Sequence, residues 1–225
     1  MANKYLTSSN PKSLNQKFRS KRFKFFTTLL KRIKSDKPLK ILDVGGREIY
    51  WERMTSSADV TIPAVQITLL NIEEIPSKNK DIINLIGDAR DLSQYKDGEF
   101  DIVYSNSVIE HLFSKENQVK MAKEVARVGK YYYIQTPNYY FPMEPHWLTP
   151  FFQFLPFGVR VFMTRKFNLG HFKKQPDKEK AVSRVSSVKL LTEKEMKELF
   201  PDGKVYREYI LGMKKSMTMY RFPEE

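Results

Sequence analysis

Short apolar runs alternate with amphipathic stretches after Pro38, and this alternation constrains the fold more than any other feature of the sequence. An apolar run bounded by turn residues is typical of a buried strand, whereas apolar residues every three to four positions are typical of a helix. Strands that alternate with helices form a parallel sheet covered on both faces, because each crossover helix buries its apolar side against the sheet. Five runs are predicted to contain strands of this sheet, at residues 39–46, 64–73, 83–92, 100–112 and 131–138.

The last part of the sequence predicts a helix followed by a hairpin. Thr192 and Glu195 have the spacing of a capping box, which marks the start of a helix. Residues 203–213 and 217–222 are two strand-like runs separated by a short basic stretch. We therefore predict an α/β fold, with a doubly wound, mostly parallel seven-stranded sheet that ends in an antiparallel C-terminal hairpin.

Composition divides the chain into three regions. Residues 1–36 carry no acidic side chain before Asp36, and the segment 17–34 is dense in Lys and Arg. Its apolar positions recur at three- to four-residue spacing, so we predict a basic amphipathic helix in this region. Residues 37–225 are predicted to form the main domain, with an aromatic and proline-rich lid inserted at about 139–188.

The 225-residue chain has a formal net charge of +13, which favours anionic partners. A helix that docks on the main domain with a solvated basic face is the plainest interpretation of the basic segment. An anionic membrane surface is the next candidate. Nucleic acid is the least favoured partner, because basic charge gives non-specific affinity for phosphates but the sequence contains no recognised nucleic-acid-binding motif.

The sequences of the lid and of the first residues indicate where in the cell the protein is expected. Four prolines interrupt the aromatic part of the lid, so it does not predict a transmembrane helix. The charged stretch 171–184 that follows predicts a loop. The sequence starts without an apolar signal core and contains no cysteine, which suits the cytosol. We expect a cytoplasmic protein, with association at a membrane left open.

The end of the first predicted strand has a pattern that suits ligand binding. Asp43 lies inside the apolar run, just before Gly45 and Gly46. Ligands of parallel sheets bind beyond the carboxyl ends of the strands, and glycine lets a ligand approach the backbone closely. We expect these three residues to line a ligand site, with the Asp43 carboxylate facing a cationic or ammonium-bearing ligand.

Polar side chains also follow the second and third predicted strands. Asn71 or Glu73 can hydrogen-bond a pair of ribose hydroxyls, and Asp88 can accept a hydrogen bond from an exocyclic amine such as that of adenine. The carboxyl ends of parallel strands meet at one edge of the sheet, so these side chains are expected on the same side as Gly45. The set predicts a nucleoside-like ligand.

This order of strand ends resembles that of the class I S-adenosylmethionine-dependent methyltransferases. The resemblance covers roughly Pro38 to the C-terminus, and SVIEHL looks like the small-molecule branch of the family. It implies S-adenosyl-L-methionine as the cofactor, with Ala89 beside the adenine and with Asn106 and Ser107 beneath the sulfonium. The segments that carry the resemblance are ILDVGG, ITLLNIE, GDARDL, FDIVYSNSVIEHL, YYYIQTPN and the closing hairpin.

Two residues depart from the family pattern. Arg47 follows Gly46, where the family has further glycines, and Asn71 stands where the family has an acidic residue. An amide bonds a hydroxyl more weakly than a carboxylate does. We therefore expect Glu73 to share the ribose-binding role.

Two histidines are candidates for a general base, which methyl transfer needs only if the acceptor must lose a proton. His111 follows the fourth predicted strand, and His146 lies on the lid in EPHW, near Glu144. A carboxylate that orients an imidazole is a reasonable base arrangement. His111 and His146 are thus predicted to be catalytic, with a purely structural role as the alternative for each. The scattered histidines and the absence of cysteine predict no metal site.

The sequence does not name the methyl acceptor. The apolar lid and the basic N-terminal helix favour a small or lipid-linked molecule. A methyltransferase-like binding protein without catalysis is the first alternative, because Arg47 and Asn71 depart from the pattern. A nicotinamide-dependent oxidoreductase needs a G-x-G-x-x-G loop, which GGREIY does not supply. An RNA methyltransferase is suggested by the net charge alone. The sequence predicts no oligomeric state.

Overall fold

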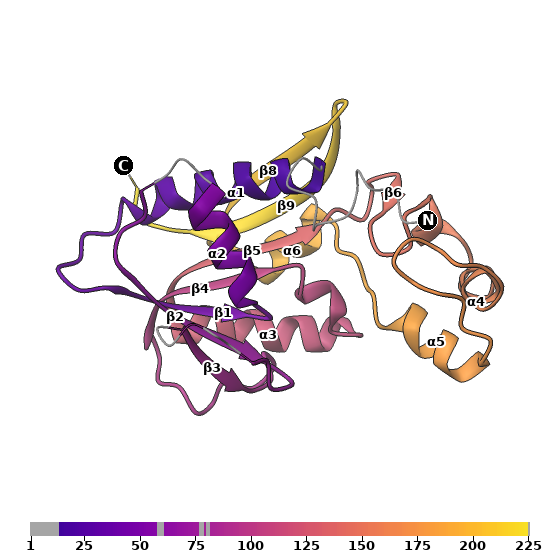
Figure 1. Ribbon diagram of the computed structural model, residues 1–225, viewed down its shortest axis with the longest axis horizontal. Coiled ribbons are helices and arrows are strands. Elements are labelled where there is room, and N and C mark those ends of the chain that lie inside the picture. Colours follow the sequence, from indigo (N-terminus) through magenta and orange to yellow (C-terminus); the bar gives the residue numbers. More distant parts are fainter. Residues whose placement is uncertain (1–13, 58–60, 77–78, 80–81, 225) are drawn as a thin grey trace.

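The computed structural model describes residues 14–57, 61–76, 79 and 82–224. The strands of its main sheet are β1 Leu39–Val44, β2 Val65–Asn71, β3 Ile82–Ile86, β4 Phe100–Asn106, β5 Gly129–Pro137, β8 Lys204–Ile210 and β9 Met213–Arg221. Within the described residues these seven strands form one sheet in the order β3-β2-β1-β4-β5-β9-β8 (Figure 1). β1 to β5 are parallel, and β9 pairs antiparallel with both β5 and β8. The predicted fold class is confirmed.

Helices cover both faces of this sheet (Figure 1). The bounds are α1 Leu14–Leu30, α2 Glu48–Ser57, η1 Ile109–His111 (a 3-10 turn), α3 Lys115–Val128 and α6 Glu193–Leu199. On one face, Phe23 of α1 and Trp51 of α2 belong to a buried cluster with Tyr104 of β4. On the other face, Val125 of α3 and Met196 of α6 belong to a second cluster.

The central strands are apolar on both sides because both faces are covered. Neighbouring residues of one strand point to opposite faces. Ile41 and Ile102 accordingly lie in the cluster under α1, whereas Leu42 and Val103 lie in the cluster under α3. This double burial explains why the strands read as continuous apolar runs in the sequence.

The basic helix α1 is part of the core. Its apolar side chains Phe23, Phe26, Leu29 and Leu30 are all at most 1% exposed. Its exposed positions include lysines, whereas Arg22 is buried at 4% exposure on the side that meets the sheet. The helix therefore presents basic side chains in two directions, toward solvent and toward the interior.

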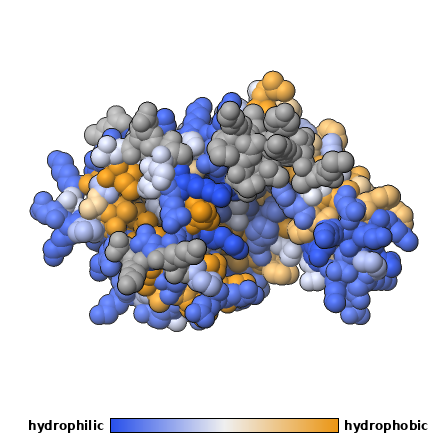
Figure 2. All heavy atoms as spheres, in the orientation of Figure 1, coloured by the Kyte–Doolittle hydropathy of each residue, from blue (hydrophilic) through white to orange (hydrophobic). Residues whose placement is uncertain are grey.

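The lid forms a lobe beyond the carboxyl ends of β4 and β5 (Figure 1). Its elements are β6 Met143–Glu144, β7 Thr149–Pro150, η2 Phe152–Phe154, α4 Phe157–Lys166 and α5 Lys178–Ser186. The lobe has its own core, in which Trp147 and Phe152 pack with Val185. The surface over α5 is hydrophilic, and apolar side chains lie over α4 above it (Figure 2).

The prediction of a loop at 171–184 was wrong, because α5 begins in this stretch. The Asp177 side chain accepts a hydrogen bond from the backbone N–H of Lys180 and caps the helix. Ala181 and Val185, four residues apart, are buried against the lobe. The high charge of the stretch hid this short apolar stripe. None of the described helices is both long enough and apolar enough to cross a membrane.

Candidate active site

The turn after β1 is built around a buried carboxylate. Asp43 is 2% exposed, and its Oδ2 accepts a hydrogen bond from Trp51 Nε1 at 2.7 Å. Burial raises the pKa of Asp43 to about 7, although the bond from Trp51 lowers it. The carboxylate also lies against Gly46, where a Cβ would come within 2.0 Å of Asp43 Oδ2. This side chain therefore joins β1 to α2 and shapes the turn, and its contact with a cationic ligand stays a prediction.

Gly45 is the exposed residue of this turn that has no side chain. Its φ of +74° is strained for any residue with a side chain, and a Cβ there would lie 2.4 Å from Val108 Cγ2. Its N–H donates to the carbonyl of Leu70 in β2. Gly45 is exposed, so its backbone is open to a ligand at the ends of β1 and β4.

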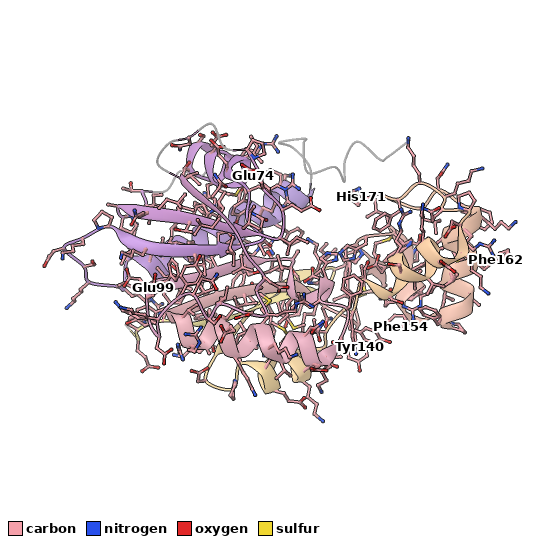
Figure 3. The ribbon with its side chains drawn as sticks, turned by 90° about the horizontal axis from the view of Figure 1, so that it is seen from below. Glu74, Glu99, Tyr140, Phe154, Phe162 and His171 are labelled. Carbon is pink, nitrogen blue, oxygen red and sulfur yellow. The ribbon has the colours of Figure 1, made fainter. Side chains whose placement is uncertain are left out.

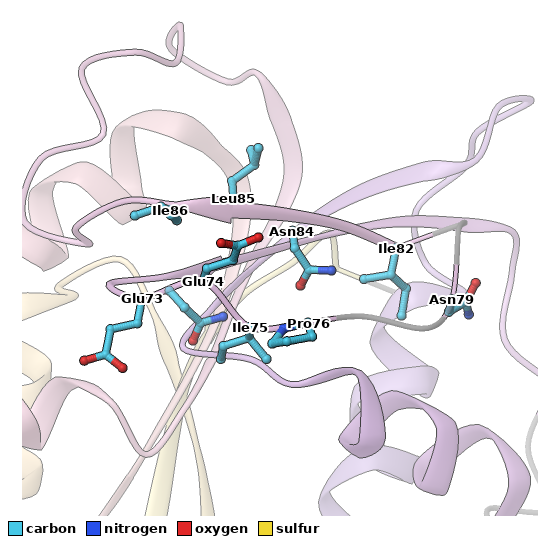
Figure 4. A pocket seen from close by; sticks show the side chains of 10 residues that line it. Glu73, Glu74, Ile75, Pro76, Asn79, Ile82, Asn84, Leu85 and Ile86 are labelled. Carbon is cyan, nitrogen blue, oxygen red and sulfur yellow. The ribbon is translucent and has the colours of Figure 1, made fainter.

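The end of β2 provides polar groups beside this turn. Asn71 Nδ2 donates to the Gly46 carbonyl at 3.0 Å, so the amide braces the turn and its Oδ1 can still accept a hydrogen bond. Glu73 is exposed. Both residues line a hollow of about 400 Å³ between the loop after β2 and β3, with Glu73 at one end and Asn79 at the other (Figure 4).

Asp88 is already engaged by a neighbouring cation. Its carboxylate accepts two hydrogen bonds from Arg90 Nε and a close one from Arg90 Nη2. These bonds lower the pKa of Asp88, so the carboxylate is charged at neutral pH. An amine ligand would share this carboxylate with Arg90. Ala89, the next residue, is 6% exposed.

The end of β4 meets α1 and β5. Arg22 Nη1 donates to Asn106 Oδ1 at 3.2 Å, which links two residues 84 positions apart. Ser107 has a positive φ of 60°, and its hydroxyl donates to Gln135 Oε1 at 3.0 Å. Arg22 was not among the predicted site residues, since nothing local in the sequence connects it with this strand end.

A cavity of about 420 Å³, here named the acceptor cavity, opens at the ends of β4 and β5. Its walls come from α1, from the two strand ends, from the lid and from the β8–β9 hairpin. The polar and charged side chains in these walls are Arg19, Arg22, Asn106, Ser107, Gln135, Asn138, His146, His171, Lys215 and Ser216. His171 lies on the side of the lobe that faces the sheet, whereas Phe162 lies at its outer end (Figure 3).

The two predicted catalytic histidines meet next to this cavity. His146 Nε2 lies 3.2 Å from His111 Nε2, although the residues are 35 positions apart. His146 Nδ1 lies 2.7 Å from Glu144 Oε1, and the other oxygen of Glu144 accepts the backbone N–H groups of His146 and Trp147. Glu144 is 1% exposed. The lid thus fixes the plane of the His146 ring through a buried carboxylate.

The surroundings separate the pKa values of the two rings. Burial and then the charge of the nearby His146 lower the pKa of His111 to about 4, although Glu144 opposes this shift. Burial also lowers the pKa of His146, but the hydrogen bond and charge of Glu144 outweigh burial, so that the net shift is upward. His146 is therefore the ring of the pair that binds a proton more readily.

A second buried carboxylate lies beside the histidines. Glu110 is 0% exposed, and its Oε2 accepts a hydrogen bond from Thr136 Oγ1 at 3.0 Å. Burial raises its pKa to about 7. One potential ligand atom each from Glu110, His111 and His146 lie within 4.8 Å of one another, close enough to share a cation. Sequence spacing predicted no metal site, because the cluster forms only when η1 meets the lid.

Comparison with known proteins places this fold in a family. Residues 42–131 match the family model described as a methyltransferase domain. The structure is similar to that of a SAM-dependent methyltransferase from Methanosarcina mazei, with a TM-score of 0.51 and 16% identity over 84% of this chain and 93% of that chain. The matched stretch is about two fifths of the chain, and the fold is that of the S-adenosylmethionine-dependent methyltransferases. The cofactor of this methyltransferase family is S-adenosyl-L-methionine.

Two further solved structures share the fold of this methyltransferase. One is phosphoethanolamine N-methyltransferase 2 of Haemonchus contortus in complex with S-adenosyl-L-methionine, with a TM-score of 0.50 and 13% identity over 88% of this chain and 39% of that chain. The other is the CurJ carbon methyltransferase, with a TM-score of 0.54 and 11% identity over 90% of this chain and 53% of that chain.

The curated relatives match over a shorter stretch. Two uncharacterized proteins, from two strains of Mycobacterium tuberculosis, are 36% identical to this chain over 66 residues. These residues make up 29% of this chain and 22% of each relative. The match therefore spans about a fifth of the relatives' length.

Proposed function

We propose that this methyltransferase transfers the methyl group of S-adenosyl-L-methionine to a small or lipid-linked acceptor in the acceptor cavity. The observation that carries this proposal is the position of the cavity, which has Asn106 and Ser107 in one wall and His146 of the lid in another. The bound cofactor supplies an electrophilic methyl group. Holding two reactants in line can lower a barrier by about 7–11 kcal/mol, and the two walls are suited to that task.

The strand ends supply groups that fit the cofactor. The exposed backbone of Gly45 would lie along its methionine end, and Gly46 would support the turn. Asn71 Oδ1 and the exposed Glu73 would accept hydrogen bonds from ribose hydroxyls. The Asp88 carboxylate would accept a hydrogen bond from the adenine amine, beside Ala89. Arg90 lowers the pKa of this carboxyl group and so keeps it charged. Asn106 would lie at the sulfonium end. Asp43 acts indirectly in this proposal, through the turn that it holds.

His146 is the proposed general base. With its Nδ1–H donated to Glu144, its Nε2 carries a lone pair that faces His111 Nε2 when no acceptor is bound. An O–H or N–H acceptor that takes the place of His111 would give its proton to this nitrogen. During the transfer, the proton of the acceptor atom would pass to His146 Nε2. Glu144 then stabilises the imidazolium. His111, with its low pKa, stays neutral and positions the His146 ring.

Exposed apolar side chains on the lid favour a lipid-linked acceptor over a fully soluble one. Phe157, Phe162 and Phe167 are 45–54% exposed and lie in or next to α4. The basic outer face of α1 would complement an anionic bilayer surface. A soluble acceptor would leave this apolar surface without a role.

Calorimetric titration with S-adenosyl-L-methionine and S-adenosylhomocysteine, with NADH as the control, tests the cofactor part of the proposal. We expect binding of the two sulfur compounds in the micromolar range and none of NADH. Incubation with methyl-labelled cofactor and cell extract, followed by solvent partition, then tests the acceptor. Label in the organic phase supports a lipid-linked acceptor, and label confined to the aqueous phase assigns a soluble one. Cofactor binding without transfer into either phase would identify a binding protein that has lost catalysis.

A further inference from the structure

The acceptor cavity contains three cationic side chains whose charges are mostly unpaired. Arg19 of α1 makes no hydrogen bond or ion pair within the described part of the chain. The Lys215 ammonium lies over the ring of Phe18, with Nζ 4.3 Å from the ring centroid, and has no ion-pair partner among the described residues. Arg22 donates through Nη1 to Asn106, but its buried Nε has no hydrogen-bond partner.

Among the residues that the structure describes, one carboxylate lies near these cations. Glu208 of β8 lies with its Oε1 3.7 Å from Arg22 Nε and also accepts a close hydrogen bond from the Ser216 hydroxyl. None of the described residues that line the cavity is an Asp or a Glu. The sequence before α1 also contains no acidic residue. Three positive charges and one negative charge leave an excess of two.

Without a bound anion, this excess of positive charge destabilises the folded protein. Buried cations lose hydration, and like charges in a cavity repel each other. Both effects act on Lys215, whose pKa falls to about 8 through burial first and then through Arg22, with Glu208 opposing the fall. Burial and the charge of Arg22 likewise lower the pKa of Arg19. An anion in the cavity would reduce the repulsion between these cations.

We propose that the methyl acceptor carries a phosphoryl group, which Arg19, Arg22 and Lys215 bind inside the acceptor cavity. A phosphate monoester is close to a dianion at neutral pH, which matches the excess of two positive charges. Arginine forks form parallel hydrogen bonds to phosphate oxygens, and a lysine adds a point charge. The inference rests on the proposed function, because it fixes the end of the acceptor that lies away from His146.

Phosphoryl binding can be tested directly on the full chain saturated with S-adenosylhomocysteine. The probe is glycerol 3-phosphate, titrated by calorimetry at constant ionic strength. We expect saturable binding to the wild type and at least tenfold weaker binding to Arg19→Met and to Lys215→Met. Lys17→Met is the matched control, because Lys17 is exposed on the same helix and loses the same charge.

A second arm separates a soluble phosphate from a lipid headgroup. Phosphatidylcholine vesicles with and without phosphatidic acid are sedimented with the wild type and with the three variants. Loss of glycerol 3-phosphate binding in Arg19→Met and Lys215→Met but not in Lys17→Met, or a loss of vesicle binding in these two variants that exceeds the loss in Lys17→Met, supports the proposal and identifies the source. An equal loss in all three variants overturns it. Equal binding by all four proteins, or no binding of either probe, overturns it.

Binding of S-adenosylhomocysteine is measured for each variant in the same experiment. If it is unchanged while phosphoryl binding is absent, the phosphoryl proposal fails and the proposed methyl transfer stands. If the wild type does not bind S-adenosylhomocysteine, the proposed function itself fails.

Discussion

At the scale of single residues, the ionisation of Asp43 is expected to make the free energy of unfolding depend on pH. The pKa of this buried carboxyl group is about 7, against an ordinary value of 3.8, so the folded state keeps the proton longer than the unfolded state does. Its contribution to the free energy of unfolding is therefore greatest below about pH 4 and decreases until about pH 7. We expect Asp43→Asn to remove this part of the pH dependence in urea unfolding measured between pH 4.5 and 8. The exposed Asp36→Asn should keep the wild-type slope, and equal slopes for all three proteins would contradict this assignment.

The hydrogen bond from Trp51 to Asp43 gives a second prediction for single residues. Trp51→Phe keeps an aromatic ring against Phe23 and Tyr104 but removes the indole N–H. A buried acceptor that loses its donor costs about 1–3 kcal/mol. We expect a loss of this size at pH 8, and a smaller loss at pH 5, where Asp43 in the folded state is protonated. A loss that does not depend on pH would point to ring packing as the cause.

His146 sets the third residue-scale prediction. Transfer to an O–H or N–H acceptor requires a neutral ring, so turnover should rise with pH through the pKa of His146, which lies above the ordinary 6.5. The charged or titratable groups around the ring are Glu144, Glu110 and His111. Glu144→Gln should shift the acidic limb of the profile to lower pH and reduce kcat. His146→Asn should lower kcat by about 10²–10⁴ while cofactor binding is unchanged.

His171→Asn is the control for these kinetics, because His171 lines the same cavity without a role in the proposed proton transfer. Its turnover should stay within a few fold of wild type. If His171→Asn and His146→Asn lose turnover equally, the effect comes from the shape of the cavity, and the assignment of His146 as the base is wrong.

At the scale of elements, the turn between β1 and α2 depends on a residue without a side chain. Gly45→Ala is unfavourable for two reasons, because the φ of +74° is strained for alanine and because the added Cβ would clash with Val108. Only the first reason applies to Gly212→Ala, since its φ is +78° and nothing lies within 4 Å of an added Cβ. We expect both variants to lose about 1 kcal/mol or somewhat more of unfolding free energy. Only Gly45→Ala should also weaken binding of S-adenosylhomocysteine, and equal binding by the two variants would exclude Gly45 from the cofactor site.

The comparison of sequence with structure is also clearest for elements. The strands were predictable because each is a local apolar run, and their order along the chain implied the parallel sheet. Helix α5 was missed because only Ala181 and Val185 of its nine residues are buried. The contact from Arg22 to Asn106 spans 84 positions, and Lys215 was read only as part of a hairpin. Such long-range contacts depend on the packing of α1 across the sheet, which no local pattern encodes. The hydrogen bond from Trp51 to Asp43 was likewise not predicted, because it depends on how α2 packs against β1.

At the scale of the whole molecule, the lobe and α1 provide two potential contacts with a bilayer. We expect the protein to co-sediment with anionic vesicles at low salt and to be released as salt screens the basic surface. Phe162→Ser should weaken this binding, because Phe162 is 54% exposed at the outer end of the lobe. Ile83→Ser is a suitable control, since Ile83 is 41% exposed on the distant edge strand β3. An absence of vesicle binding at low salt would leave a soluble acceptor as the better proposal.

The position of α1 has a consequence for how the protein is made. Phe25 of α1 stacks on Tyr206 of β8 with 4.2 Å between ring centroids and meets Tyr220 of β9 edge-on. During synthesis α1 emerges before every strand of the sheet, yet its partners β8 and β9 emerge last. A nascent chain can therefore pack α1 against α2, β4 and β5, but its contacts with β8 and β9 wait until translation reaches those strands. Because Lys215 comes from the same late hairpin, the acceptor cavity is completed only when this hairpin packs against α1.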